Sequence, residues 1–279
     1  MEELYLRLSE ASVPQATVVC IMISAILAVA IPAFLALYIF KKYNCSLKPL
    51  LAGALTWLVF ARIIEGLAHQ IILRGDVGAT IQSNLVLYAL YGGVMAALFE
   101  EFGRLIVMKT ALKKEFDYDR NALMFGAGHG GIEAIVILGL AMLSNLTYAQ
   151  QINNHTIGSV YELLKTMPEE QGVAVLQSLL SLTNTESGLF LLGIVERIPA
   201  LALHLAMSAL VWKAVKDGKY VYFVLSLAVH FLTDFTTVII SGTVANIYLA
   251  EALIVAVCTV LSVIIFFFLK NKEKEESIQ

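Results

Sequence analysis

The sequence predicts an all-α membrane protein, a bundle of seven transmembrane helices with its N terminus outside and its C terminus in the cytoplasm. Hydrophobic residues make up 59 % of the 279 residues and charged residues only 15 %, with a mean hydropathy of +0.79. Soluble domains average roughly 45–50 % apolar and about 25 % charged residues. The composition therefore indicates a multi-pass protein of the cell membrane, and it gives no reason to expect a nucleic-acid partner.

Seven segments qualify as spans, since a helix needs about 20 mainly apolar residues to cross the hydrocarbon core. In chain order they are residues 14–40, 49–73, 82–109, 121–147, 188–213, 220–242 and 245–269. Most Lys and Arg residues lie in alternate connections and in the C-terminal tail, at 41–48, 109–120, 213–219 and 270–279. Because cytoplasmic loops carry an excess of positive charge, this asymmetry predicts the stated orientation.

The start of the chain and the longest connection between spans give two further expectations. The start of the chain has no basic segment, and the first apolar run is too long for a signal peptide, so no cleavage is expected. The outer connection, about 148–187, contains apolar residues at helical spacing over 160–182, which predicts one amphipathic helix that lies at the interface or caps the bundle. No repeat or linker divides the chain, so residues 1–279 are expected to form a single domain.

Ionisable residues occur at one depth in four of the predicted spans. They are Glu100, His129, His204 and His230. Each stands nine to eleven residues from the basic residue at the cytoplasmic end of its span, which corresponds to about 14–16 Å at 1.5 Å per residue. A charged group in the bilayer core costs roughly 2.5–3.5 kcal/mol. Although a lone histidine in a span is more often a packing residue, the common depth predicts a shared polar site.

Each of these residues has a polar neighbour one helical turn away on the same face. The pairs are Glu100 with Arg104, His129 with Glu133, His204 with Ser208, and His230 with Asp234. The carboxylates Glu133 and Asp234 can accept a hydrogen bond from a histidine of their own helix or of a neighbouring one, which would fix its tautomer. Arg104 can neutralise one glutamate of the pair Glu100 and Glu101, leaving the other for acid–base chemistry. Arg62 and Glu65 are expected to form a separate, structural pair.

Three short motifs resemble those of the superfamily of CAAX prenyl proteases and bacteriocin-processing enzymes. They are "EEFGR" at 100–104, "FGAGH" at 125–129 and "HFLTD" at 230–234. Within this superfamily the chain is most similar to the YhfC family, with PrsW as a more distant relative, over about residues 82–240. His204 in "HLAMS" resembles an additional histidine motif of some branches. The spacing of Arg104 departs from the EExxxR pattern of the CAAX proteases.

The resemblance implies an intramembrane endopeptidase that hydrolyses a peptide bond in the cytoplasmic half of the membrane. Its implied catalytic residues are Glu100, Glu101, His129, His230 and Asp234, supported by Arg104, Glu133 and His204. One of the two glutamates would take a proton from a water held by His129 and His230. If zinc is bound, His129, His204 and His230 are its natural ligands. The HExxH spacing is absent, and a metal-free, glutamate-dependent mechanism is the alternative.

Three other classes of function fit the same polar residues, one of them a haem protein in which paired histidines serve as axial ligands. An ion- or proton-coupled transporter also uses intramembrane Glu, His and Arg, but such carriers often show paired repeats with broken helices. This sequence shows no such symmetry, and its few prolines predict continuous spans. A non-catalytic membrane scaffold is the second alternative. The expected partners are membrane lipid and a peptide or membrane-protein substrate, and the sequence predicts no oligomeric state.

Overall fold

The computed structural model describes residues 1–276, with side chains up to Lys272. Within this range every regular element is helical, and seven helical segments are long and apolar enough to cross a membrane. They are Gln15–Tyr43, Leu47–Ile72, Leu85–Ala111, Asn121–Asn153, Ser187–Asp217, Val221–Thr243 and Ile247–Lys272. Each overlaps one of the predicted ranges. The prediction of an all-α, multi-pass integral membrane protein is therefore confirmed.

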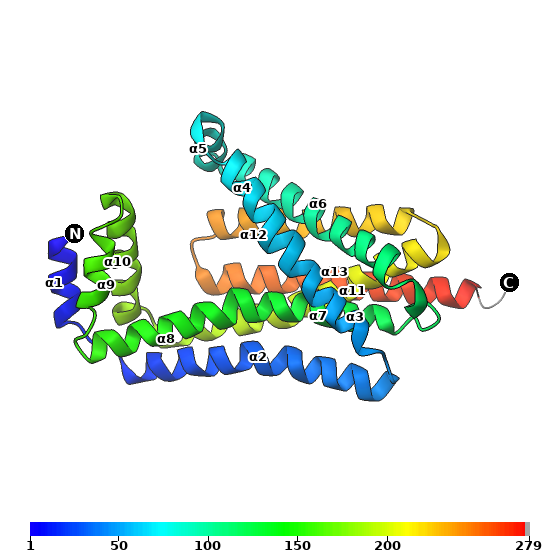
Figure 1. Cartoon of the computed structure of the whole chain (residues 1–279), viewed down its shortest axis with the longest axis horizontal. Helices are drawn as coiled ribbons and strands as arrows, with labels where there is room; N and C mark the ends of the chain where they lie inside the picture. The colour runs from blue at the N-terminus through cyan, green and yellow to red at the C-terminus, as the bar shows by residue number, and fades with distance from the viewer. Residues whose placement is uncertain (277–279) are drawn as a thin grey trace. The chain divides into compact units, whose positions relative to one another are not determined.

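Several spans are built from more than one helical element (Figure 1). The elements are α1 (Glu2–Glu10), α2 (Gln15–Tyr43), α3 (Leu47–Trp57), η1 (Leu58–Glu65), α4 (Gly66–Ile72), α5 (Gly75–Ser83), α6 (Leu85–Ala111), η2 (Lys113–Glu115), α7 (Asn121–Ala134), η3 (Ile135–Gly139), α8 (Leu140–Asn153), α9 (Gly158–Leu164), α10 (Glu169–Asn184), η4 (Ser187–Leu191), α11 (Leu192–Asp217), α12 (Val221–Thr243) and α13 (Ile247–Glu276).

Residue contacts group the chain into two compact units. The first comprises residues 1–30 and 135–195, and the second comprises 31–134 and the described residues from 196 onward.

The first unit has its own apolar core, which includes Leu8 and Leu176. Helix α1 packs against α10, and Tyr5 stacks on Tyr161 with ring centroids 4.1 Å apart. The prediction of one amphipathic helix over 160–182 is wrong. The structure forms α9 and α10 instead, with Pro168 as the N-cap of α10. Proline lacks the N–H that a helix interior needs, so the chain breaks before it.

Glycines on two faces of α7 allow its neighbours in the second unit to approach closely. A Cβ atom at Gly126 or Gly130 would meet α11 around His204. On another face, a Cβ at Gly128 would overlap the carbonyl oxygen of Leu50 in α3. Conversely, a Cβ at Gly53 of α3 would overlap the carbonyl oxygen of Phe125. Backbones that approach this closely need glycine, and the contacts fix the part of α7 that carries His129.

Gly128→Ala is expected to lower the free energy of unfolding by about 1–3 kcal/mol, the usual cost of overpacking. The new methyl group would push α3 away from α7, because the atom that it meets is backbone and cannot turn aside. Gly92→Ala in α6 is the matched control, since a Cβ there has nothing within 4 Å and alanine favours a helix by roughly 0.5–1 kcal/mol. Thermal unfolding in detergent measures both. Equal melting temperatures for the two variants would contradict the packing argument.

Two spans contain π-helical stretches, which the expectation of continuous spans did not include. The stretch η1 lies between α3 and α4 and ends at Glu65, and η3 begins directly after α7. π-Helical turns are rare and occur frequently at functional sites. Both stretches adjoin polar residues: η1 carries Arg62 and Glu65, and η3 starts two residues after Glu133.

Candidate active site

Four helices of the second unit carry the candidate side chains into one buried cluster. Glu100 and Glu101 are on α6, His129 is on α7, His204 is on α11 and His230 is on α12. None of these five residues is more than 7 % exposed. The structure therefore brings together the residues that the sequence placed at one depth.

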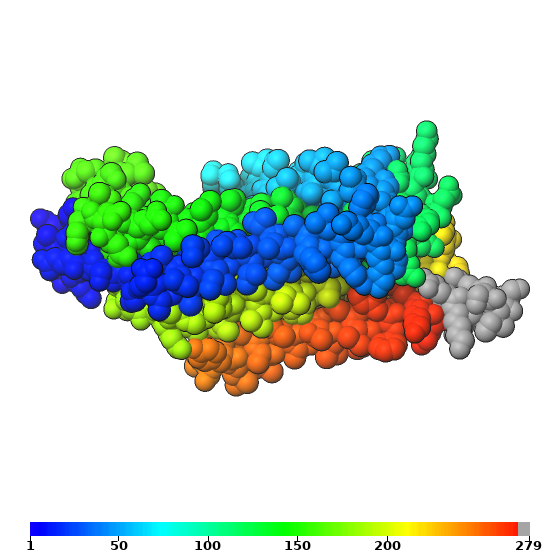
Figure 2. Space-filling model, turned by 90° about the horizontal axis from the view of Figure 1, so that it is seen from below, coloured from blue at the N-terminus to red at the C-terminus, as the bar shows by residue number. Residues whose placement is uncertain are grey.

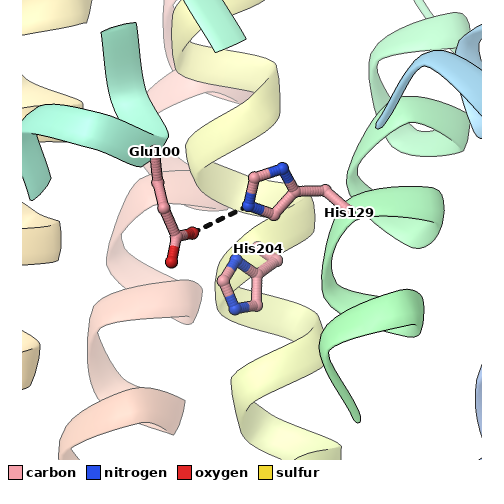
Figure 3. A group of neighbouring side chains, drawn as sticks. All are labelled: Glu100, His129 and His204. Carbon is pink, nitrogen blue, oxygen red and sulfur yellow. Dashed lines mark hydrogen bonds and ion pairs between the residues drawn. The ribbon is translucent and has the colours of Figure 1, made fainter. Parts of the chain in front are cut away.

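Glu100 lies at the centre of this cluster. Its Oε2 atom is 2.7 Å from Nε2 of His129, and both side chains are labelled in Figure 3. The same oxygen is 3.7 Å from Nη2 of Arg104 and 3.9 Å from Nε2 of His230. One carboxylate oxygen thus faces two imidazoles and a guanidinium, and its hydrogen-bond partner is the imidazole of His129.

Glu101 is held by three donors and is fully buried. It forms an ion pair with Arg104, and its Oε1 lies 2.7 Å from Nδ1 of His230. Its Oε2 accepts a 2.6 Å hydrogen bond from the hydroxyl of Ser226. Both oxygens of the Glu101 carboxylate therefore already have hydrogen-bond partners within the protein. Sequence reasoning missed Ser226, which stands four residues before His230 and so shares its helix face.

The bond to Glu101 also fixes the role of one ring nitrogen of His230. An ionised carboxylate only accepts hydrogen bonds, so Nδ1 of His230 must carry the proton. Nε2 of the same ring faces Glu100, 3.9 Å away, and Oδ2 of Asp234, 3.5 Å away. The proton on Nδ1 is inferred from its carboxylate partner. The contact with Asp234 is the expected one between residues four apart.

His204 is engaged at both ring nitrogens. Nδ1 lies 2.7 Å from Nη2 of Arg104, and since a guanidinium has only donors, Nδ1 accepts. Nε2 therefore carries the proton, and it lies 2.7 Å from Oε2 of Glu133. His204 thus links Arg104 to Glu133. The expected pairing of His204 with Ser208 is wrong, because the Ser208 hydroxyl has no hydrogen-bond partner among the described residues.

Glu133 does not pair with His129 of its own helix, and the histidine that it meets is His204 on a neighbouring helix, one of the two pairings that the sequence left open. It contacts His204, as described, and its Oε1 accepts a 2.9 Å hydrogen bond from Nη1 of Arg197. Nδ1 of His129 is left without a hydrogen-bond partner in the described part of the chain. Residues four apart on one helix share a face, but the rotation of that helix selects which one meets a neighbour. The contact of Arg197 with Glu133 was not predicted from the sequence.

Glu65 is a further buried carboxylate close to the cluster. It lies on η1, and the sequence pairs it with Arg62, but this expectation is wrong. Its Oε1 is instead 3.2 Å from Nε2 of His69, and Nδ1 of His69 is 2.7 Å from the hydroxyl of Tyr91. Arg62 is exposed and forms no ion pair with any described residue.

The side chains present fit a metal ion. Glu100, His129 and His204 each offer one ligand atom, and these atoms all lie within 4.8 Å of one another (Figure 3). Two imidazole nitrogens and a carboxylate oxygen are a donor set that suits zinc. His204 would have to release a partner to bind, whereas Nε2 of His230 makes longer contacts, 3.5 Å to Asp234 and 3.9 Å to Glu100. The Nδ1–H of His230 already faces a carboxylate, as is usual for metal-bound histidines. Glu100 and His129 are thus common to both possible ligand sets.

Two comparisons identify relatives of this chain. A family model described as "YhfC intramembrane metalloprotease" matches residues 27–255, which include every candidate residue. A protein from Bacillus subtilis (strain 168), described as "Uncharacterized membrane protein YhfC", is 34 % identical over 252 residues. That alignment covers 90 % of this chain and 95 % of the relative. No solved structure matches the chain.

Proposed function

We propose, since this chain belongs to the YhfC intramembrane metalloprotease family, that its buried Glu/His cluster hydrolyses a peptide bond within the membrane. The observation that carries the proposal is the pair formed by Glu100 and His129. It joins two helices through a 2.7 Å contact inside the second unit, and a carboxylate oriented by an imidazole can act as the general base of hydrolysis. The substrate would be a peptide or the membrane segment of another protein.

In this proposal Glu100 is the general base. It takes a proton from the attacking water as the oxygen of that water bonds to the scissile carbonyl carbon. His129 orients Glu100 through Nε2. When the carbon–nitrogen bond breaks, Glu100 returns the proton to the leaving amine. Glu101 is unsuited to this task, because its three donors hold it in place.

The remaining polar residues hold the reacting groups in position. Glu101 accepts a hydrogen bond from Nδ1 of His230 and so orients the ring with Nε2 toward Glu100. Arg104 contacts Glu101 and His204 and lies 3.7 Å from Glu100, which keeps positive charge beside the two carboxylates. Holding the reacting groups in a fixed, productive geometry lowers the entropic part of the activation barrier.

A metal would be held by His129 with His230 or His204, and with Glu100 as a ligand if another group serves as base. A zinc ion, when bound, would polarise the attacking water and stabilise the developing oxyanion as a Lewis acid. The same residues can also support the metal-free, glutamate-dependent route.

Zinc content distinguishes these two routes without a substrate. We expect close to one zinc per chain, measured by mass spectrometry, in protein purified in detergent without chelator. His129→Ala/His230→Ala should remove it, whereas His155→Ala leaves the cluster intact, because His155 contacts the backbone oxygen of Ser9 in the first unit. Equal zinc in all three proteins, or none in any, would contradict the metal site and leave glutamate-dependent hydrolysis.

Hydrolysis itself is tested by reconstituting the protein in vesicles together with solubilised membrane proteins of the host cell. Mass spectrometry of peptide termini should detect new termini within or next to membrane segments. The same vesicles without the protein provide the background. An unchanged set of termini would contradict a protease and favour the scaffold or transporter.

A further inference from the structure

An apolar groove lies at the C-terminal end of α2, far along the chain from the cluster residues. Its volume is about 430 Å3, and its lining residues are Phe34, Leu37, Tyr38, Lys41 and Lys42. Phe34 is 72 % exposed and Leu37 is 57 % exposed. This half of α2, in mid-blue, lies uncovered on the face shown in Figure 2. The candidate span ends at Tyr43, and both lysines lie in its last turn. Basic residues at the end of a spanning helix are expected at the level of the headgroups.

The cations beside this groove have no carboxylate partner. Lys41, Lys42 and Arg120 form no ion pair with any acidic side chain of the described chain. Aromatic rings hold two of them instead. The Nζ atom of Lys42 is 4.8 Å from the ring centroid of Tyr38 and 5.3 Å from that of Tyr43, and Cζ of Arg120 is 5.1 Å from the latter. Positive charge is thus collected at one place without being neutralised.

The hydrogen bond within this group leaves donors free for a ligand. Lys42 donates to the hydroxyl oxygen of Tyr38, so the Tyr38 O–H proton can point away toward an acceptor. An ammonium has three donors and no acceptor. Lys42 therefore keeps further N–H groups, and exposed Lys41 adds its own. Phosphate oxygens accept such hydrogen bonds strongly, because both partners are charged.

We propose that this groove binds an anionic phospholipid. The phosphate lies against Lys41, Lys42 and the Tyr38 hydroxyl, and one acyl chain lies over Phe34 and Leu37. Charge complementarity selects an anionic lipid over a zwitterionic one, because excess basic residues near the membrane surface attract anionic headgroups. The exposed apolar floor selects a lipid over a free phosphate. This proposal does not depend on the hydrolytic function.

Native mass spectrometry of the full-length protein tests it, with phosphatidylglycerol and phosphatidylcholine as probes. We expect wild-type protein to retain phosphatidylglycerol in preference. In Lys41→Gln/Lys42→Gln that retention should fall by roughly tenfold or more, since each basic residue contributes about a fivefold factor. Both residues are exposed, and the melting temperature verifies that the variant folds.

The matched control is Lys113→Gln/Lys114→Gln, which removes the same charge from exposed residues of η2 that do not line the groove. This variant should retain phosphatidylglycerol as the wild type does. Equal losses in the two double variants would show a general charge effect and overturn the proposal. Equal retention of the two lipids, or competition by glycerophosphoglycerol without acyl chains, would overturn it as well.

Discussion

Glu100→Gln is expected to reduce hydrolysis by about 10²–10⁴-fold, the range that general acid–base catalysis contributes. Glutamine has the same size and keeps an oxygen that can accept from Nε2 of His129, but it cannot take a proton from water. The rate at which new peptide termini form in reconstituted vesicles measures the effect. The melting temperature should stay close to that of the wild type, because the 2.7 Å contact can be retained.

Glu251→Gln provides the control for this prediction. It makes the same chemical change on α13 rather than on a helix of the cluster, and it should hydrolyse substrate at the wild-type rate. Full hydrolysis by Glu100→Gln would refute the assignment of Glu100 as the base. Full hydrolysis by both Glu100→Ala and Glu101→Ala would refute any glutamate-dependent mechanism at this cluster.

Arg104→Met is expected to lower the free energy of unfolding by about 3–5 kcal/mol, the cost of removing one partner of a buried ion pair. Arg104 and Glu101 are both 0 % exposed. Loss of the guanidinium leaves the Glu101 carboxylate buried with only His230 and Ser226 as donors, and it leaves Nδ1 of His204 without its donor. Unfolding by a denaturing detergent, followed by circular dichroism, measures this loss.

Arg62→Met is the matched control, because Arg62 is an exposed arginine of a spanning segment without an ion pair to any described residue. It should change stability little or increase it, since an unpaired charge in the bilayer is itself unfavourable. The double variant Arg104→Met/Glu101→Leu should recover part of the loss, as replacing both partners removes the uncompensated charge. A stable Arg104→Met variant would contradict the ion-pair argument.

The sequence was sufficient to predict the spans and the central residues of the cluster, but not Ser226 or Arg197. Runs of about 20 apolar residues identify the spans, and counting residues from the basic ends placed Glu100, His129, His204 and His230 at one depth. Family membership is confirmed by the comparisons. These predictions succeeded because they need only the length of a helix and the rise per residue.

The contacts within the cluster could not be predicted in the same way, because they depend on how each helix is rotated about its axis. His230 meets Asp234 of its own helix, yet His129 does not meet Glu133. The two adjacent glutamates look equivalent in sequence, and only the structure separates the committed Glu101 from Glu100. The orientation of the termini, the single domain and the substrate stay predictions.

The division of the cluster among helices has a consequence for biosynthesis. Ribosomes make the chain from the N terminus, so α6 and α7 enter the membrane before α11 and α12 exist. Glu100 and His129 can form their contact at that stage. The hydrogen bonds of Glu101 with His230 and Ser226, and that of Arg104 with His204, form only after the later helices have been made. A ribosome-bound intermediate therefore carries an incomplete site. A nascent chain that stops before α12 has the ion pair of Glu101 with Arg104 on α6, but it lacks His230 and Ser226, the two other donors to that carboxylate.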